Sequence, residues 1–174
     1  MAVLPPINFL KWIEENKEFL KPPVNNRVVY KDTEFIIMVV GGPNSRKDYH
    51  YNEGEEFFYQ IKGDIIVKIQ EEGKAKEVSI KEGEIFLLPP RIPHNPVRLK
   101  DTIGLVIERK RRENEKDGLL WFCEKCNHKL YEEYFKLTDI TTQFQKVFEK
   151  FYNSLELRTC KNCGSVLEPP PVIA

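Results

Sequence analysis

Two of the chain's three histidines and one glutamate are spaced in a way that could build a metal centre. His50 precedes Glu56 by six positions, with a turn at Gly54 between them, and His94 closes the proline-rich segment 89–94. Two imidazoles and one carboxylate on one face of an octahedron suit Fe(II) and leave three coordination positions open. Open positions let a substrate and dioxygen bind side by side. The spacing therefore favours a catalytic iron site over two unrelated histidines and a solvated glutamate.

The four cysteines predict a second metal site of a different kind. They form two pairs with two residues inside each pair, Cys123 with Cys126 and Cys160 with Cys163. Four thiolates suit a closed tetrahedral site for zinc or iron, and the paired spacing makes four unliganded thiols the weaker interpretation. Because four protein ligands leave no open position, we expect a structural or electron-carrying site. His128, near the first pair, is expected to be a surface residue and not a fifth ligand.

Short strands separated by turns must position the histidines and the glutamate. Between about 28 and 109 the chain has short runs rich in Val, Ile and Phe, divided by glycine and proline turns. The predicted strands are 34–40, 55–61, 64–70, 77–81, 84–88 and 102–108. Many short strands at this spacing indicate a β-sandwich or barrel. Ahead of them, residues 8–20 predict a helix with Asn8 as its N-cap, which the segment 21–23 would end.

The rest of the chain, 113–174, predicts a small unit that we separate from 1–112 as a second domain. The segment 109–112 and the acidic residues after it form a charged linker, expected to be solvated because the two signs offset each other. Between the cysteine pairs, a helix predicted over 139–152 carries an apolar face. Its side chains are Ile140, Phe144, Val147, Phe148 and Phe151. We expect this face to pack against the protein and not against a cofactor.

The composition is that of a globular protein without a surface for nucleic acid. The 174 residues suffice for one packed domain and a small appendage, and a hydrophobic fraction of 41% argues against disorder. Lys+Arg and Asp+Glu both number 27, so the cationic excess of a nucleic-acid binder is missing. Residues 1–11 lack a signal-peptide pattern, and no apolar run approaches the ~20 residues of a membrane span. We therefore expect a cytoplasmic protein with reduced thiols and no membrane or nucleic-acid partner.

The histidines and the glutamate resemble the two motifs of the cupin family. The first motif covers 50–63, with Asn52 where a second histidine is usual, and the second covers 83–94, with Arg91 where a glycine is usual. The ordered pair of motifs is more specific than either block. The resemblance implies a mainly β fold, a jelly-roll barrel (double-stranded β-helix) with an N-terminal helix and a small C-terminal four-cysteine metal module containing one helix. The Arg91 departure bears on the pocket entrance and not on the metal ligands.

Over nearly its whole length the chain resembles the 3-hydroxyanthranilate 3,4-dioxygenase family in its microbial and fungal form. The segments that carry this resemblance are 21–26, 39–44, 48–50, 55–60, 82–90, 94–98, 106–109 and 121–123. The four-cysteine appendage is itself a mark of this form, because animal members lack it. The match is far more specific than the general cupin motifs.

The resemblance implies an Fe(II) centre held by His50, Glu56 and His94 that opens an aromatic ring with dioxygen. The implied substrate, 3-hydroxyanthranilate, is an aminophenol with a carboxylate, whose oxygen and amine would take two of the open metal positions. Dioxygen would take the third. Cleavage between ring carbons 3 and 4 gives 2-amino-3-carboxymuconate semialdehyde, which closes to quinolinate, a precursor of NAD.

The same resemblance assigns roles to three further residues. Arg98 matches the position that binds the substrate carboxylate, for which a guanidinium offers a charged fork. Glu108 matches a partner that also contacts the substrate, as the ligand Glu56 does. Arg46 matches an arginine placed towards dioxygen. The competing interpretation, a set of surface ion pairs, is less favoured because the motifs match.

Two other functions stay open beside the dioxygenase. One is a cupin that binds or isomerises a small aromatic acid without using dioxygen, because one fold hosts many activities. The other is a nucleic-acid adaptor built on the cysteine pairs, which the neutral net charge disfavours. We further expect a homodimer, as is usual in the family, with iron or zinc at the four cysteines.

Overall fold

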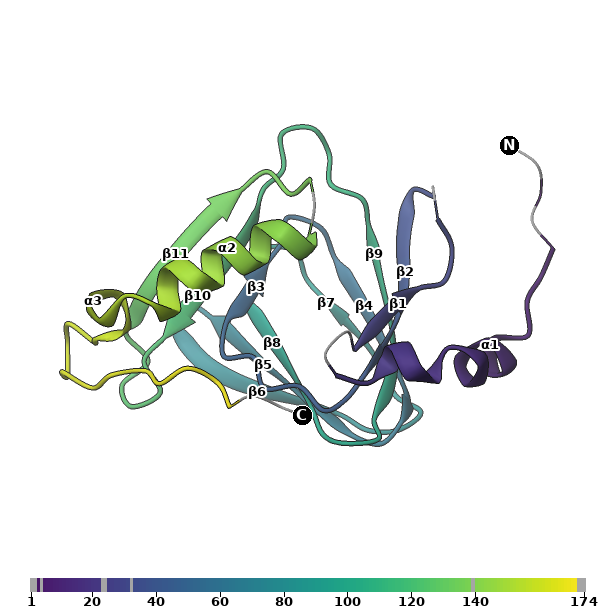
Figure 1. The fold of residues 1–174 in the computed structure, drawn as a ribbon, viewed down its shortest axis with the longest axis horizontal. Coiled ribbons are helices and arrows are strands. Elements are labelled where there is room, and N and C mark those ends of the chain that lie inside the picture. Colours follow the sequence, from purple (N-terminus) through teal and green to yellow (C-terminus); the bar gives the residue numbers. More distant parts are fainter. Residues whose placement is uncertain (1–2, 4, 23–24, 32, 139, 172–174) are drawn as a thin grey trace.

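Two antiparallel β-sheets that face each other form the framework of the molecule (Figure 1). The computed structural model describes residues 3, 5–22, 25–31, 33–138 and 140–171, with the backbone alone for 140–142. Within these residues one sheet has the strand order β1-β2-β9-β4-β7 and the other has the order β11-β10-β3-β8-β5-β6. The strands are β1 (Asn26–Val28), β2 (Phe35–Gly41), β3 (Tyr49–Tyr51), β4 (Glu56–Lys62), β5 (Ile65–Glu71), β6 (Lys74–Ile80), β7 (Ile85–Leu88), β8 (His94–Arg98), β9 (Ile103–Arg109), β10 (Asp117–Phe122) and β11 (Lys129–Phe135).

The order of the strands is that of a jelly roll. β2-β9-β4-β7 form one wall and β3-β8-β5-β6 form the other, so the chain passes back and forth between the sheets. This arrangement pairs strands that are distant in sequence and leaves an interior between two walls. The predicted class, a mainly β jelly-roll barrel, is confirmed, and the six predicted strands correspond to β2, β4, β5, β6, β7 and β9.

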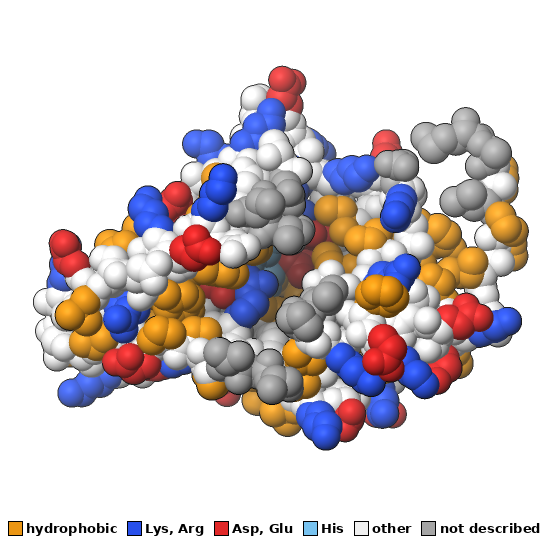
Figure 2. Space-filling view, viewed as in Figure 1, with side chains coloured by type: hydrophobic (Ala, Val, Ile, Leu, Met, Phe, Trp, Pro, Cys, Tyr) orange, Lys and Arg blue, Asp and Glu red, His pale blue; other side chains and the backbone are white. Residues whose placement is uncertain are grey.

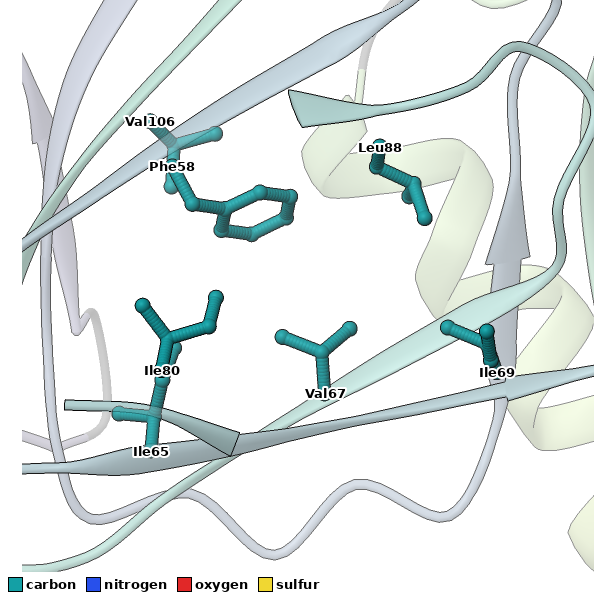
Figure 3. Packing of buried hydrophobic residues seen from close by; sticks show 7 residues of the cluster. All are labelled: Phe58, Ile65, Val67, Ile69, Ile80, Leu88 and Val106. Atoms are coloured by element: carbon teal, nitrogen blue, oxygen red, sulfur yellow. The ribbon is translucent and has the colours of Figure 1, made fainter. Parts of the chain in front are cut away.

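The barrel core lies between the two walls. Along β5 the buried side chains alternate with exposed ones, so that Ile65, Val67 and Ile69 point inward. They meet Phe58 and Val106 from the opposite wall (Figure 3). Burying an aliphatic or aromatic side chain of this size contributes about 1.5–3 kcal/mol each, so this cluster is the main source of barrel stability. The packed core fills one part of the interior, and polar residues line the remainder.

The N-terminal helix covers the outside of the first sheet. α1 (Phe9–Glu15) begins after Asn8, whose side chain accepts a hydrogen bond from the Lys11 amide at 3.0 Å. A 3₁₀ helix (Lys17–Leu20) follows, so the predicted helix over 8–20 is divided in two. Ile13 and Leu20 pack there against Val39 of β2. Of the predicted stop at 21–23, residue 23 lies outside the described residues.

The C-terminal part extends the barrel's second sheet. β10 is antiparallel to β3, with Leu119 opposite His50, and β11 pairs with β10. The division at 112/113 stays a prediction, but the two parts of the chain share one sheet. α2 (Ile140–Tyr152) lies across β10 and β11 in Figure 1, and α3 (Leu155–Arg158) follows it.

The predicted apolar face of the helix over 139–152 packs as expected. Residue 139 and the side chain of Ile140 lie outside the described parts, but the other members of that face join a second core. Trp121 is fully buried there and stacks on Phe151 with 4.3 Å between the ring centroids. Among the helices that the structure describes, none has the length and apolarity needed to cross a membrane.

Candidate functional site

The three predicted metal ligands come from three strands and meet inside the barrel. His50 of β3 lies directly opposite His94 of β8, and Glu56 begins β4 in the other wall. One donor atom from each side chain can be chosen so that all lie within 4.8 Å of one another. Glu56 and His94 are buried, and His50 is partly exposed. The structure therefore brings the predicted ligands together, and this donor set could hold a metal ion.

Electrostatics at the ligands favour a cation between them. His94 Nε2 lies 3.0 Å from Glu56 Oε2, while His94 Nδ1 faces the Ile92 carbonyl oxygen at 3.0 Å. Burial opposes both charges, but the ion pair outweighs it: the pKa of Glu56 is lowered and the pKa of His94 is raised. A divalent cation bound by these two side chains would take the place of the His94 proton.

His50 is held from behind by a residue that the sequence analysis did not single out. Asp117, at the start of β10, is fully buried, and its Oδ1 lies 2.7 Å from His50 Nε2. When Nε2 donates to this carboxylate, Nδ1 is the ring nitrogen left to bind a metal. Carboxylates in this position orient a ligand histidine and fix its tautomer.

Arg111 joins Asp117 to the pocket. Its Nη2 donates to Asp117 Oδ1 at 2.6 Å, and its Nη1 lies 2.9 Å from Glu108 Oε2. The Arg111 side chain is only 11% exposed, so the prediction of a solvated linker is wrong at this residue. Two opposite charges six positions apart were the sole sequence signal, and such pairs are common on protein surfaces.

The six residues predicted for the barrel site all line one cavity of about 150 Å³. Figure 2 shows the surface hollowed between α2 and the barrel, with acidic and histidine side chains at the floor of the hollow. The six residues are His50, Glu56, His94, Arg46, Arg98 and Glu108. Their convergence makes a surface ion-pair set the wrong description for Arg98 and Glu108, which are 2% and 5% exposed.

Arg98 is a buried cation without an acidic partner. Its Nη1 donates to the Gln60 side-chain oxygen at 3.3 Å, and it forms no ion pair with any residue that the structure describes. Burial lowers the pKa of Arg98 to about 10, although the Glu56 charge raises it. The guanidinium therefore stays charged at neutral pH and faces the cavity with unused donors, as an anion-binding group would.

Glu108 lies directly across the strands from Glu56, so two carboxylates share the floor of the cavity. Burial and the Glu56 charge together raise the pKa of Glu108. Asn52, the residue at the usual second histidine of the cupin motif, donates to both carboxylates, at 3.2 Å to Glu56 and 3.3 Å to Glu108. Its amide thereby separates two like charges that would otherwise repel.

Arg46 lies where the barrel meets the C-terminal helix. Its guanidinium pairs with Asp48 and lies over the rings of Phe144 and Phe148, at 5.6 and 5.4 Å from their centroids. Phe144 also lines the cavity and lies 5.5 Å from the His50 ring. The sequence analysis predicted Phe144 as a packing residue only, so its place in the cavity wall was missed.

The four predicted thiol ligands also converge. Cys123 Sγ lies 3.6 Å from Cys163 Sγ, and Cys126 Sγ lies 3.5 Å from Cys160 Sγ. Metal–sulfur bonds of about 2.3 Å in a tetrahedron give sulfur–sulfur edges of roughly 3.8 Å, so the cluster could hold a metal ion. Burial raises the pKa of Cys123, but hydrogen bonds from the Ser165 hydroxyl and backbone amides outweigh it and the pKa is lowered.

Comparison with known proteins shows the family of the chain. Residues 1–152 match the family model of 3-hydroxyanthranilic acid dioxygenase. A 3-hydroxyanthranilate 3,4-dioxygenase from Xanthomonas euvesicatoria is 56% identical over 97% of this chain and 95% of its own. A protein of the same name from Bacillus cereus is 51% identical over 92% of this chain and 90% of its own.

Among solved structures, a cupin-2 domain containing protein from Shewanella frigidimarina overlaps 60% of this chain and 94% of its own, with a TM-score of 0.48 and 15% identity. The family assignment rests on the family model and on the two relatives above. The match to the Xanthomonas protein covers 169 residues of this chain, so it includes the cysteine-rich part as well as the barrel. The chain therefore belongs to the 3-hydroxyanthranilic acid dioxygenase family of enzymes.

Proposed function

We propose that this enzyme is an Fe(II)-dependent 3-hydroxyanthranilate 3,4-dioxygenase. In this proposal it cleaves the ring between carbons 3 and 4 and forms 2-amino-3-carboxymuconate semialdehyde, which closes to quinolinate for NAD synthesis. One observation carries the proposal: the His50, Glu56 and His94 donors and the unpaired Arg98 cation face the same cavity. The volume of about 150 Å³ is also that of a cavity that admits a benzene ring in another protein.

The donor set fits iron because two imidazoles and one carboxylate bind Fe(II) and leave adjacent positions open. Bound Fe(II) supplies coordination positions for the substrate and for dioxygen, and the electron that dioxygen needs. Arg98 binds the substrate carboxylate through a charged fork, which also sets the orientation of the ring. Glu108, whose pKa is raised, accepts a hydrogen bond or a proton from a polar group of the substrate. Arg46 stabilises negative charge at the side of the cavity next to Phe144.

Oxygen uptake by metal-loaded enzyme tests the proposal. We expect one dioxygen consumed per 3-hydroxyanthranilate after anaerobic loading with Fe(II), followed by the absorbance of quinolinate. Enzyme loaded with Zn(II) should bind substrate without consuming oxygen, because zinc has no accessible redox state. 2-Aminophenol is the matched control compound, because it lacks the carboxylate, and it should bind more weakly than 3-hydroxyanthranilate. Full turnover with zinc alone would refute the iron assignment, and binding without oxygen uptake by the iron form would support the non-oxygenase alternative.

The proposal includes a homodimer in the cytoplasm. Phe35 of β2 and Ile85 and Leu87 of β7 are more than half exposed on the outer face of the first sheet. Exposed apolar groups of this size on one sheet face support an interface between two copies. Light scattering should give twice the chain mass of 20.5 kDa, and Leu87→Asp should halve it. An unchanged mass in the Leu87→Asp variant would show that this sheet face does not form the interface.

A further inference from the structure

Asp117 and Arg111 stand behind the cavity and do not line it. They contact one candidate metal ligand and one candidate substrate contact: Asp117 meets His50 at 2.7 Å, and Arg111 meets Glu108 at 2.9 Å. We propose that Asp117 and Arg111 are a positioning pair that sets the orientation of His50 and Glu108 together. The inference rests on the proposed function, because it assigns a role to the same site.

The first half of the pair acts on the histidine. An imidazole can rotate and exchange its two nitrogens, and each rotation presents a different atom to the metal. The fully buried Asp117 carboxylate accepts from His50 Nε2 and so holds the proton on that nitrogen. Asp117 is itself held, because Arg111 Nε donates to its Oδ2 at 2.9 Å and Arg111 Nη2 donates to its Oδ1 at 2.6 Å.

The second half acts on the pocket carboxylate. Glu108 and Glu56 face each other across β9 and β4, so a nearby cation is needed to keep both close to the metal site. Arg111 provides it through the 2.9 Å ion pair to Glu108 Oε2. Because a guanidinium is rigid and planar, its contact with Asp117 fixes the position from which it meets Glu108. A change at either carboxylate is therefore transmitted to the other.

A neighbouring pair provides a matched comparison. Arg109, two positions earlier, forms the same kind of two-bond contact with Glu115, at 2.6 and 2.5 Å. Neither residue lines the cavity or forms an ion pair with a candidate metal ligand. Both pairs bridge the connection between β9 and β10, so two purely structural pairs would be expected to have similar effects when removed. Of the two pairs, only Arg111–Asp117 contacts residues of the candidate site.

Metal affinity tests the first half. Asp117→Asn keeps the shape of the side chain but removes its charge, so His50 is free to take either tautomer. With zinc in the four-cysteine site and the barrel emptied, Co(II) would be titrated and followed by its visible absorption. We expect binding in the barrel to weaken about 10- to 100-fold, the usual effect of removing such a partner. Arg109→Gln is the control and should bind Co(II) as the parent does.

Substrate affinity tests the coupling. Arg111→Gln should weaken Co(II) binding and also, in the metal-loaded protein without oxygen, the binding of 3-hydroxyanthranilate, while Asp117→Asn affects the metal more than the substrate. The double variant should lose less Co(II) affinity than the product of the two single losses, because both act through one contact. Arg111→Lys keeps the charge but not the fork and should fall between the parent and Arg111→Gln.

The results separate this inference from the proposed function. A loss of Co(II) affinity below about fivefold in both Asp117→Asn and Arg111→Gln, or an equal loss in Arg109→Gln, overturns the positioning role. If Arg111→Gln does not fold, by circular dichroism, Asp117→Asn and Arg111→Lys decide the question. A parent protein that binds Co(II) in the barrel but consumes no oxygen with Fe(II) would instead refute the dioxygenase. The metal titration would still test the pair in that case.

Discussion

The two candidate metal sites of this chain are built in opposite ways. In the four-cysteine site, each pair closes a local turn, with the Asn127 amide donating to the Cys123 carbonyl at 2.9 Å and the Gly164 amide to the Cys160 carbonyl at 2.8 Å. The barrel site has no such local frame, since its three ligands lie on three strands. The first is held by turns and the second by sheet register. The barrel site should therefore respond to changes in many distant residues.

Removing a barrel ligand should separate the two sites most clearly. His94→Ala takes away one of three metal donors, so we expect loss of the barrel metal and a fall in turnover of at least about 1,000-fold, or ~4 kcal/mol in barrier height. Metal analysis should find the four-cysteine ion unchanged. The exposed His128 provides the control, since His128→Ala should keep both metals and full activity. Retained turnover in His94→Ala would exclude the barrel site from catalysis.

Removing the buried cation should affect the substrate and spare both metals. Arg98→Ala deletes a charge-assisted bond to a carboxylate, which costs about 1.5–3 kcal/mol, or roughly 10- to 150-fold in affinity. Titration of zinc-loaded enzyme with 3-hydroxyanthranilate measures this without turnover. Arg98→Lys should recover part of the affinity, because it restores the charge without the fork. Equal affinity in Arg98→Ala and the parent would contradict the carboxylate assignment.

Acidity should weaken metal binding in the barrel. A protonated His94 cannot bind metal, and its pKa is raised above the ordinary 6.5, so protons compete at neutral pH. Barrel affinity should rise about tenfold per pH unit until the pH passes the His94 pKa. Protons compete at the thiolates as well, because burial raises the pKa of Cys160 to about 11 although the pKa of Cys123 is lowered. Co(II) titrations between pH 6 and 8 test this, and a flat barrel affinity would show that His94 binds no proton in the free protein.

In the metal-free protein the Glu56–His94 ion pair should stabilise the fold over a limited pH range. The lowered pKa of Glu56 adds stability that is present above its ordinary 4.5 and is lost as the pH falls. The raised pKa of His94 adds stability that is present below 6.5 and is lost as the pH rises through the folded value. We therefore expect the melting temperature of the metal-free protein to peak between these values. A melting temperature that rises steadily above pH 6.5 would contradict the ion pair.

Breaking the second site should have the smallest effect on catalysis. Cys160→Ser with Cys163→Ser removes half of the thiolates, so the region after 119 should become more sensitive to protease. Turnover per barrel iron should stay within about tenfold, or ~1.4 kcal/mol. The reason is that Phe144, which lines the cavity, is held by the core around Trp121 and not by the cysteines. A folded double variant with barrel iron but no turnover would mean that the thiolate site serves catalysis.

Local patterns predicted the strands that carry the core, including β4 with Glu56, and missed the two strands that carry the histidines. β8 was missed because its sequence includes Pro96, which cannot donate to a sheet ladder. The structure accommodates it because β8 pairs with β3 only at His94, so the proline needs no partner there. β3 is three residues long, too short for any alternation to show. β3 and β8 carry ligands and lie beside turns, so they lack the apolar alternation on which strand prediction depends.

Residue types and spacings were enough to predict the two ligand sets, the barrel class and the family, because they carry that information directly. Three residues outside the barrel motifs reach the same site only through the three-dimensional fold: Arg111, Asp117 and Phe144. They arrive there because β10 pairs with β3 and α2 packs on β10. Pairing between strands more than 60 positions apart depends on which apolar faces are buried together, and no local pattern specifies that partner.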